Sequence, residues 1–251
     1  MKLIVCGACG RMGKNVAEVA QNTGVEIVCG VDLHPCPMPF PVYASFQEVC
    51  EQADAIIDFS SVQNLSERLN FCKARNLPIV LAATGYSDED LKTVAEAERH
   101  IPVFRTGNLS LGINLLQLLV KRTAEVLGEN FDVEIIERHH NKKKDAPSGT
   151  ALMLAESVNE GFEQQKQFVY GRQGLTGERE KSEVGIHAVR GGTIVGEHEV
   201  MFAGEDEIIT LSHSARSRKV FASGAIKAAA WLCGKPAGKY GMSDLLKDIV
   251  K

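Results

Sequence analysis

The residues best suited to chemistry lie in one stretch, EIIERHHNKKKDAPSGTA, which spans residues 134–151. His139 and His140 end a segment with the alternation of a β-strand, and Lys143 follows in a basic loop. Histidine exchanges a proton near neutral pH, and lysine can donate a proton or bind a carboxylate. Because adjacent residues of a strand point in different directions, the two histidines can have different roles. The stretch predicts an acid/base site for an acidic substrate.

The end of the same stretch predicts a place for a carboxylate. Ser148, Gly149 and Thr150 open a predicted helix, where free backbone N–H groups favour an anion. A lysine run taken alone is more often a solvated loop, and paired histidines alone are more often surface residues. Their combination with a helix start favours a site. No HxxxH spacing or carboxylate ligand set accompanies the histidines, so no metal is expected.

A glycine-rich turn near the N-terminus is the second candidate site. Gly7, Gly10 and Gly13 lie between a predicted strand, residues 3–7, and a predicted helix, residues 11–24. Glycines there permit a tight turn and a close approach of the backbone to a pyrophosphate. The spacing is GxxGxxG and not the more usual GxGxxG, so the strand–turn–helix context carries much of the prediction. The alternative, a glycine turn that binds nothing, is less favoured.

Asp32 favours NADH as the cofactor. It ends the next predicted strand, 19 residues after Gly13, where a carboxylate can accept hydrogen bonds from the adenosine ribose. The same carboxylate would repel the 2′-phosphate of NADPH, and neither arginine nor lysine follows it directly. Arg11 and Lys14 could partly offset that repulsion, so use of NADPH stays open.

Two further strand ends are expected to line the cofactor crevice, because ligands bind at the carboxyl ends of parallel strands. Small side chains there leave room for a nicotinamide ring. The residues concerned are Ala82, Ala83, Thr84 and Gly85 after one strand, and Thr106, Gly107, Asn108 and Leu109 after the next.

The first third of the chain alternates apolar strands with amphipathic helices. Strands are predicted over residues 3–7, 25–32, 54–60, 77–85 and 101–108, and helices over 11–24, 46–53, 62–76 and 88–100. The proline-rich segment 33–44 is expected to be an irregular loop. This rhythm predicts an α/β, Rossmann-like domain with a parallel sheet covered on both faces.

After residue 109 the pattern changes to that of a second domain. The expected elements are helices over 111–128 and from about Ser148, strands over 131–140, 183–192, 193–203 and 206–215, and a helical tail from residue 220. Residues 1–109 and 218–251 are expected to form the dinucleotide-binding domain. Residues 110–217 are expected to form an α+β domain with a mixed or antiparallel sheet, for substrate binding and oligomerisation. Hinge closure near 108–110 and 217–220 would then bring the two ligands together.

Composition argues against several other classes of protein. The 251 residues carry 28 basic and 32 acidic side chains, a net charge of −4, so neither nucleic acid nor a membrane is an expected partner. No apolar run approaches the length of a membrane span and the N-terminus lacks a signal-peptide layout, so a cytoplasmic location is expected. The seven cysteines are expected to be thiols. Cys6 and Cys9 have CxxC spacing, but they lie in the glycine turn and no second CxxC completes a zinc site.

The segment ERHHNKKKDAPSGTA resembles the signature of the dihydrodipicolinate reductase family, enzymes of lysine and diaminopimelate biosynthesis. The resemblance covers nearly the whole chain in order. It includes GACGRMG at 7–13, DFS at 58–60, ATG at 83–85, GNLSLGIN at 107–114, RGGTIVGEHEVMF at 190–202 and FASGAIKAAAWLCGKPAGKYGM at 221–242.

The resemblance implies an NAD(P)H-dependent reduction of 4-hydroxy-tetrahydrodipicolinate to tetrahydrodipicolinate by a homotetramer. It implies that His139 is the acid/base residue and Lys143 the proton donor. It also implies that the substrate, a small dicarboxylate, contacts His140, Lys143, Gly149 and Thr150. The implied cofactor contacts are Gly7, Ala8, Cys9, Gly10, Arg11, Met12, Asp32, Ala82, Ala83, Thr84, Thr106, Gly107, Asn108 and Leu109.

The sequence also departs from the family pattern. Ala82 and Ala83 replace Gly-Thr, and Asn141, Lys142 and Lys144 fill variable positions to which no role is assigned. Two competing hypotheses are a two-domain dehydrogenase of aspartate or homoserine and an NADH-sensing regulator without turnover. Neither has a use for the segment from His139 to Thr150.

Overall fold

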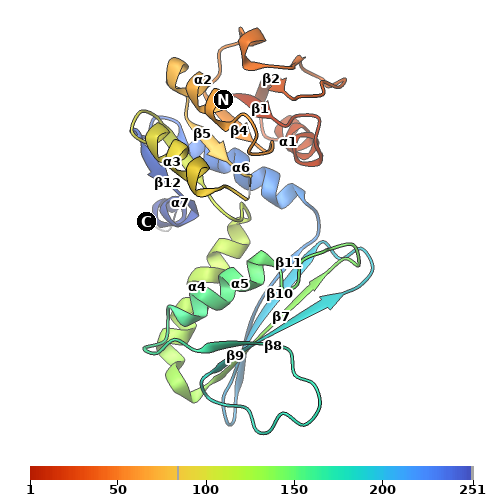
Figure 1. Cartoon of the computed structure of the whole chain (residues 1–251), viewed down its shortest axis with the longest axis vertical. Coiled ribbons are helices and arrows are strands. Elements are labelled where there is room, and N and C mark those ends of the chain that lie inside the picture. The colour runs from red at the N-terminus through yellow and green to blue at the C-terminus, as the bar shows by residue number, and fades with distance from the viewer. Residues whose placement is uncertain (84, 250–251) are drawn as a thin grey trace. The chain divides into compact units, whose positions relative to one another are not determined.

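The computed structural model of the chain describes residues 1–83 and 85–249. It divides into two compact units. The first consists of Met1–Leu111 and Arg218–Lys251, and the second of Gly112–Ser217. The chain thus returns to the first unit after completing the second (Figure 1).

The first unit is built on a seven-stranded parallel sheet with the strand order β12-β6-β5-β4-β1-β2-β3. Its strands are β1 (Lys2–Cys6), β2 (Glu26–Val31), β3 (Val42–Tyr43), β4 (Ala55–Asp58), β5 (Ile79–Leu81), β6 (Pro102–Arg105) and β12 (Gly238–Tyr240). Its helices are α1 (Arg11–Gln21), α2 (Leu65–Arg75), α3 (Asp88–Ala97), α6 (Lys219–Leu232) and α7 (Met242–Ile249), with a 3₁₀ turn η1 (Phe46–Glu48). The prediction of a Rossmann-like parallel sheet is confirmed.

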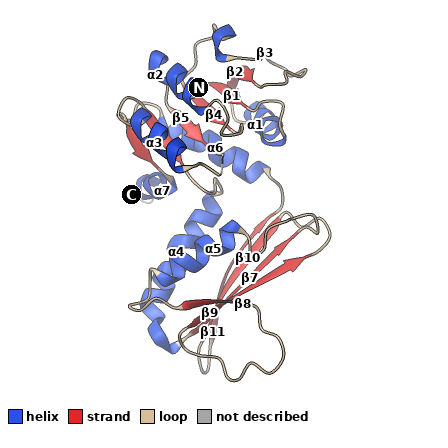
Figure 2. Ribbon diagram, viewed as in Figure 1, coloured by secondary structure: helices blue, strands red, loops and turns tan. Residues whose placement is uncertain are grey.

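Helices cover both faces of this sheet because its strands are apolar on both sides (Figure 2). Leu3 and Val5 of β1 pack in one apolar cluster with residues of α1, α6 and α7. Ile4 and Cys6 point to the other face and pack with residues of α2 and α3. The carboxyl ends of the strands are thereby left as the edge where loops can form a site.

Three details of this unit differ from the sequence prediction. The helix predicted over 46–53 is wrong: Ser45 and Glu48 cap only the short turn η1, and the chain is extended again at Val49, which is buried. Strand β3 lies inside the segment expected to be irregular, and β12 follows the last predicted helix. Both are short strands at the two edges of the sheet, formed by pairing with β2 and β6 and not by a hydrophobic period of their own.

The second unit is a five-stranded mixed sheet with the order β11-β10-β7-β9-β8. Its elements are α4 (Leu111–Leu127), a 3₁₀ turn η2 (Gly128–Asn130), β7 (Asp132–His139), α5 (Gly149–Asn159), β8 (Gln167–Tyr170), β9 (Glu183–Arg190), β10 (Gly196–Ala203) and β11 (Ile208–Ala215). Strand β10 is antiparallel to β7 and β11, whereas β9 is parallel to β7 and β8. The mixed sheet was predicted, and β8 was not.

The alternation of β7 determines what reaches its buried face. Val133 and Ile135 are fully buried and pack with α4 and α5 in one cluster. Because side chains repeat every second residue, Glu137 and His139 continue the same face and are buried as well. An acidic and a basic group therefore extend an apolar row toward the end of the strand. Among the described residues, no helix is long and apolar enough to cross a membrane.

Candidate active site

The glycine turn has the geometry of a close-packed backbone cradle. Gly7 has φ +72°, and a Cβ there would lie 2.9 Å from the backbone nitrogen of Ser60. A Cβ on Gly13 would lie 2.4 Å from the carbonyl oxygens of Gly7 and Ala8. The turn leads directly into α1, whose N-cap, Gly10, supplies no side-chain cap. Backbone N–H groups at this helix start suit a pyrophosphate, so the residues present fit a dinucleotide.

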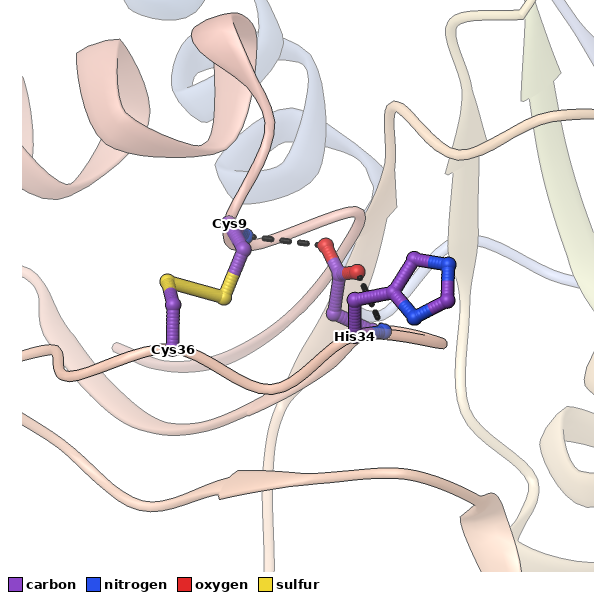
Figure 3. The surroundings of a disulfide bond; sticks show 4 residues. Cys9, His34 and Cys36 are labelled. Carbon is purple, nitrogen blue, oxygen red and sulfur yellow. Dashed lines mark hydrogen bonds between the residues drawn. A yellow bond between two sulfur atoms is a disulfide. The ribbon is translucent and has the colours of Figure 1, made fainter.

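Asp32 lies beside this turn, as predicted from its spacing. Its Oδ2 accepts a hydrogen bond from the backbone N–H of Cys9 at 2.9 Å, and its Oδ1 accepts one from the N–H of His34 at 3.0 Å (Figure 3). Each carboxylate oxygen keeps a further lone pair for a ribose hydroxyl. The carboxylate is therefore oriented by the glycine turn before any ligand binds.

The expectation that every cysteine is a thiol is wrong for two of them. Cys9 and Cys36 form a disulfide whose Cα atoms lie 5.8 Å apart, which joins the glycine turn to the proline-rich loop after β2 (Figure 3). The loop folds back over the turn, so residues 27 positions apart come within bonding range. The CxxC spacing with Cys6 is irrelevant, because Cys6 is buried in the sheet as a free thiol.

A pocket adjoins Asp32 at the ends of β1, β2 and β4. Its lining includes Leu33, Phe46, Ser60, Gln63 and Arg68, which the analysis of the sequence did not assign to the cofactor site. The rule that ligands bind at strand ends could have indicated Ser60. Phe46 gave no such signal, because its segment was expected to be a helix.

Arg68 brings a cation to this pocket, but its guanidinium is already engaged. It pairs with the buried carboxylate of Asp58 at 2.8 Å and donates to the carbonyl oxygens of Ser61 and Gln63 at 2.9 and 3.2 Å. Burial raises the pKa of Asp58, although Arg68 and a hydrogen bond from Ser60 oppose that rise. The buried pair holds the end of β4 and leaves little of the guanidinium for a phosphate.

The other predicted cofactor residues also lie along the carboxyl edge of the sheet. Ala82 donates a backbone hydrogen bond to the carbonyl of Asp58 at 2.9 Å, so it directly follows β5 beside β4. Thr106 Oγ1 donates to the carbonyl of Asn108 at 3.0 Å and forms a tight turn after β6. Arg11 and Met12 begin α1, whereas Ala83, Gly107 and Leu109 continue the two strand ends. Thr84 lies outside the described residues.

The second cluster of predicted residues surrounds a buried carboxylate, Glu137. Its Oε2 lies 2.6 Å from Nδ1 of His139, and its Oε1 accepts from the backbone N–H of Ser148 at 2.9 Å. Arg190 donates to both oxygens at 2.7 Å. Burial by itself would raise the pKa of Glu137, but the hydrogen bonds from Arg190, His139 and Ser148 outweigh it and hold the pKa below its usual value. The carboxylate is therefore ionised and ties His139 to the start of α5.

His198 borders the same cluster as a neutral ring. Its Nε2 lies 3.0 Å from Oγ of Ser148, which caps α5 by accepting from the N–H of Ala151 at 3.1 Å. The ring also lies edge-on to that of His139, with centroids 5.1 Å apart. Burial first, and then the neighbouring His139, lowers the pKa of His198 to about 4. At neutral pH the ring supports the helix start without adding a charge.

Lys143 lies in the loop between β7 and α5 and is paired with Asp145 at 2.9 Å. The hydrogen bond from Lys143 lowers the pKa of Asp145. The backbone N–H of Lys143 donates to the carbonyl of His140, whose Nδ1 is buried and, in the part of the chain described, without a hydrogen-bond partner. Gly149 and Thr150 are the first two residues of α5. The structure thus places all of the predicted substrate residues in one strand–loop–helix segment. Among the described residues, the ammonium of Lys143 pairs with Asp145 and with neither histidine ring.

Glu137, Arg190 and His198 were missed by the sequence analysis. The two-residue spacing from His139 could have indicated Glu137, since both belong to one face of β7. Arg190 and His198 carried no local signal. Sheet pairing brings them in, because Arg190 of β9 is opposite His139 and His198 of β10 is opposite Glu137.

The first unit has a glycine turn and a carboxylate at the edge of a parallel sheet. The second has a buried acid/base cluster at a helix start. Together these features define a nicotinamide-dependent oxidoreductase of two units. Residues 1–109 match the family description "Dihydrodipicolinate reductase, N-terminus", and residues 112–246 match "Dihydrodipicolinate reductase, C-terminus". The chain belongs to the dihydrodipicolinate reductase family, as the resemblance predicted.

Relatives of known name are similar to this chain in sequence over nearly its full length. The chain is 53% identical to the 4-hydroxy-tetrahydrodipicolinate reductase of Caldanaerobacter subterraneus subsp. tengcongensis, with 98% of each chain covered. It is 40% identical to the reductase of the same name from Acinetobacter baumannii, with 96% of this chain and 94% of that one covered.

Solved structures are similar to this chain in fold over most of its length. A dipicolinate-bound dihydrodipicolinate reductase from Paenisporosarcina sp. TG-14 has a TM-score of 0.77 and 25% identity, covering 97% of this chain and 98% of that one. A probable dehydrogenase from Thermotoga maritima, at 13% identity and a TM-score of 0.60, covers 97% and 92% of the two chains and shares the fold alone.

Proposed function

We propose that this chain catalyses the NAD(P)H-dependent reduction of 4-hydroxy-tetrahydrodipicolinate to tetrahydrodipicolinate, in lysine and diaminopimelate biosynthesis. One observation carries the proposal: an ionised buried carboxylate, Glu137, joins the acid/base ring of His139 to the start of α5. A ring that can exchange a proton is thereby placed beside a helix start that can bind a carboxylate. The relatives named above carry the name of this reaction, and one solved relative holds dipicolinate, a planar dicarboxylate.

The first unit binds the cofactor in this proposal, and the cofactor supplies the hydride. Arg11 and Met12 at the start of α1 present backbone N–H groups to the pyrophosphate, whereas those of Gly7 and Gly10 donate to the carbonyls of Val31 and Gly7 and shape the turn. Asp32 accepts hydrogen bonds from the adenosine ribose. NADH is favoured over NADPH, because the oriented carboxylate of Asp32 repels a 2′-phosphate and the nearby guanidinium of Arg68 is engaged with Asp58. Residues after β5 and β6 border the nicotinamide.

The second unit binds the dicarboxylate. One carboxylate is received by the backbone N–H groups of Gly149 and Thr150, with His140 and Lys143 as further contacts. Lys143 delivers the proton that matches the hydride, with His139 as the alternative donor. Asp145 is paired with Lys143 in this structure, so the substrate carboxylate has to compete with Asp145 for the ammonium. We propose that the two units close on one another about the chain segments that join them. This closure would keep water out during hydride transfer.

The assembly and location proposed here follow from the family. The face of the second sheet that is opposite α4 and α5 carries exposed apolar side chains, including Val189 and Ile208. Burial of such side chains between copies fits the homotetramer expected for this family. The expected location is the cytoplasm, where the pathway's small metabolites are made.

A coupled assay tests the function directly. The substrate is generated in place from pyruvate and aspartate semialdehyde by the preceding synthase, and oxidation of NADH and of NADPH is followed in parallel. Oxidation that depends on the synthase supports the proposal, and the ratio of the two kcat/KM values tests the cofactor preference. Reduction of NAD⁺ by aspartate, without turnover of the dihydrodipicolinate-type substrate, would favour the competing dehydrogenase. Binding of NADH without turnover on any of these substrates would favour the sensor.

A further inference from the structure

Glu137 is the point where three separated segments meet. Its two oxygens receive the ring of His139 from β7, the backbone N–H of Ser148 from the start of α5, and both terminal nitrogens of Arg190 from β9. One nitrogen of Arg190 also donates to the carbonyl of Asp145 at 2.7 Å. The carboxylate is fully buried, so its orientation is fixed by these donors and not by water.

This arrangement decides which ring nitrogen of His139 carries a proton. An ionised carboxylate can only accept hydrogen bonds, so Nδ1, at 2.6 Å, has to be the donor. Nε2 is then the atom that exchanges protons with a ligand. Nε2 lies against Gly196, where a Cβ would be only 3.0 Å away. The missing side chain at Gly196 leaves room at the exchanging nitrogen.

We propose that Glu137 is a positioning residue that fixes His139 as the Nδ1–H tautomer, and that Gly196 keeps the opposite nitrogen accessible. Arg190 holds the carboxylate in place from the neighbouring strand. Because the same carboxylate binds the N-cap of α5, the proton-exchanging ring and the carboxylate-binding helix start are oriented together. This inference rests on the proposed role of His139 in the proposed function.

The direct test is the ¹⁵N NMR spectrum of histidine-labelled protein, with the His139 signals assigned from their loss in His139→Asn. In the native chain we expect Nδ1 to carry the proton of the neutral ring. In Glu137→Gln we expect a mixture of tautomers and a kcat lower by on the order of 10²-fold. The matched control is Glu134→Gln on the same strand, since Glu134 also bonds a histidine and arginines but not His139. The control is expected to change neither the His139 signals nor kcat.

The inference is wrong if Glu137→Gln keeps the native tautomer, whatever its activity. Gly196→Ala supplies a second test that leaves all partners of Glu137 in place. We expect that variant to keep the tautomer and the affinity for NADH but to lose kcat, and a native kcat would overturn the role of Gly196. The tautomer is observed without turnover, so these results are independent of the coupled assay. Failure of that assay, with the Nδ1–H tautomer present, would count against the proposed function alone.

A separate observation concerns the disulfide between Cys9 and Cys36. It joins the two segments that flank Asp32: the glycine turn, whose Cys9 N–H bonds that carboxylate, and the loop after β2, whose His34 N–H bonds it too. Backbone pairing holds the far end of this loop, where the N–H of Gly30 donates to the carbonyl of Pro41. The disulfide is thus a covalent tether across the middle of a proline-rich loop, at the predicted ribose site (Figure 3).

We also propose that this disulfide is a redox-sensitive clamp on the dinucleotide site. Thiol–disulfide exchange with a soluble dithiol transfers two electrons and two protons: the S–S bond breaks, Cys9 and Cys36 become thiols, and the dithiol becomes a disulfide. Both cysteines are partly exposed and open to attack, whereas Cys6 and Cys72 are buried thiols whose pKa values burial raises. Opening the clamp frees the loop beside Asp32, so the reduced protein binds the dinucleotide less tightly.

Thiol counting and NADH titration test the clamp. Denatured protein is expected to show five free thiols before treatment with a dithiol and seven after it. We expect the Kd for NADH to rise several-fold on reduction and in Cys36→Ser, but not in Cys50→Ser, which removes an exposed free thiol. Seven thiols in protein treated with an oxidised dithiol would overturn the clamp, as would an unchanged or lower Kd after reduction.

Discussion

The two candidate binding regions offer different kinds of chemical group to a ligand. In the first unit, the glycine turn and the end of β2 offer mainly backbone N–H groups and one oriented carboxylate, Asp32. In the second, the end of β7 and the start of α5 offer a buried set of charged and polar side chains around Glu137. The first arrangement suits a ligand whose position must be fixed. The second suits a ligand that exchanges a proton, because buried partners shift pKa values.

The largest expected effect separates Lys143 from the lysines beside it. Lys143→Ala should lower kcat by on the order of 10²–10⁴-fold, the usual contribution of a general acid, with little change in NADH binding. Lys142→Ala and Lys144→Ala are matched controls, because both side chains are exposed and have no assigned role. Steady-state kinetics in the coupled assay measures all three. A native kcat in Lys143→Ala would contradict its role as proton donor.

A steric change should affect the first region and leave the second intact. In Gly13→Ala the added methyl would lie 2.4 Å from two carbonyl oxygens of the turn, so the turn has to open. We expect the affinity for NADH to fall by more than about tenfold, or about 1.4 kcal/mol, as measured by fluorescence titration. Gly191→Ala is the control, since a Cβ there meets nothing within 4 Å. Equal affinities for the two variants would show that the turn does not form the site.

Asp32 should determine the choice between cofactors. Asp32→Ser removes the charge that repels a 2′-phosphate but keeps a hydrogen-bonding group. We expect the ratio of kcat/KM for NADPH to that for NADH to rise by about tenfold, since one charge contact near the surface contributes on the order of 1 kcal/mol. An unchanged ratio would place the determinant of cofactor choice elsewhere.

The smallest expected effect is a pH dependence of stability that arises in the second region. The pKa of folded His198 is about 4, below the unfolded value of about 6.5, so the unfolded chain binds more protons between these values. Stability therefore falls as pH falls through 6.5, by roughly 1 kcal/mol from pH 7 to pH 6. Urea unfolding at several pH values should show this slope in the native chain and a smaller one in His198→Gln.

The carboxylate of Glu134 does not obscure that slope. Burial by itself would raise the pKa of Glu134. Hydrogen bonds from Arg172, Arg179 and His187 outweigh burial and lower that pKa to about 2. Its stabilisation is present above about pH 4.5 and is lost as pH falls from there toward 2. The half-buried ring of His213, whose pKa is also lowered by partial burial, acts in the same direction as His198 and leaves a residual slope in the variant. Equal slopes in the native and variant proteins would refute a neutral, buried His198.

The sequence by itself determined the features that depend on local periods. The alternation of strand and helix predicted the parallel sheet. The spacing of Gly7 and Gly13 predicted the tight turn, and the distance to the next strand end predicted that Asp32 lies beside that turn. The run from His139 to Thr150 also lies within one local strand–loop–helix unit, so its grouping needed no long-range contact. Where the local pattern was ambiguous, the prediction was wrong: residues 46–53 were expected to be a helix, but only the short turn η1 forms there.

Only the tertiary structure decided which distant residues complete the two regions. Arg190 and His198 reach Glu137 because β9 and β10 pair with β7 in one register, and a shift by one residue would turn each side chain to the other face. Cys36 reaches Cys9 because an irregular, proline-rich loop folds back over the glycine turn. Neither sheet register nor the course of such a loop is encoded by a period of the sequence. Both are fixed by packing between segments far apart in the chain.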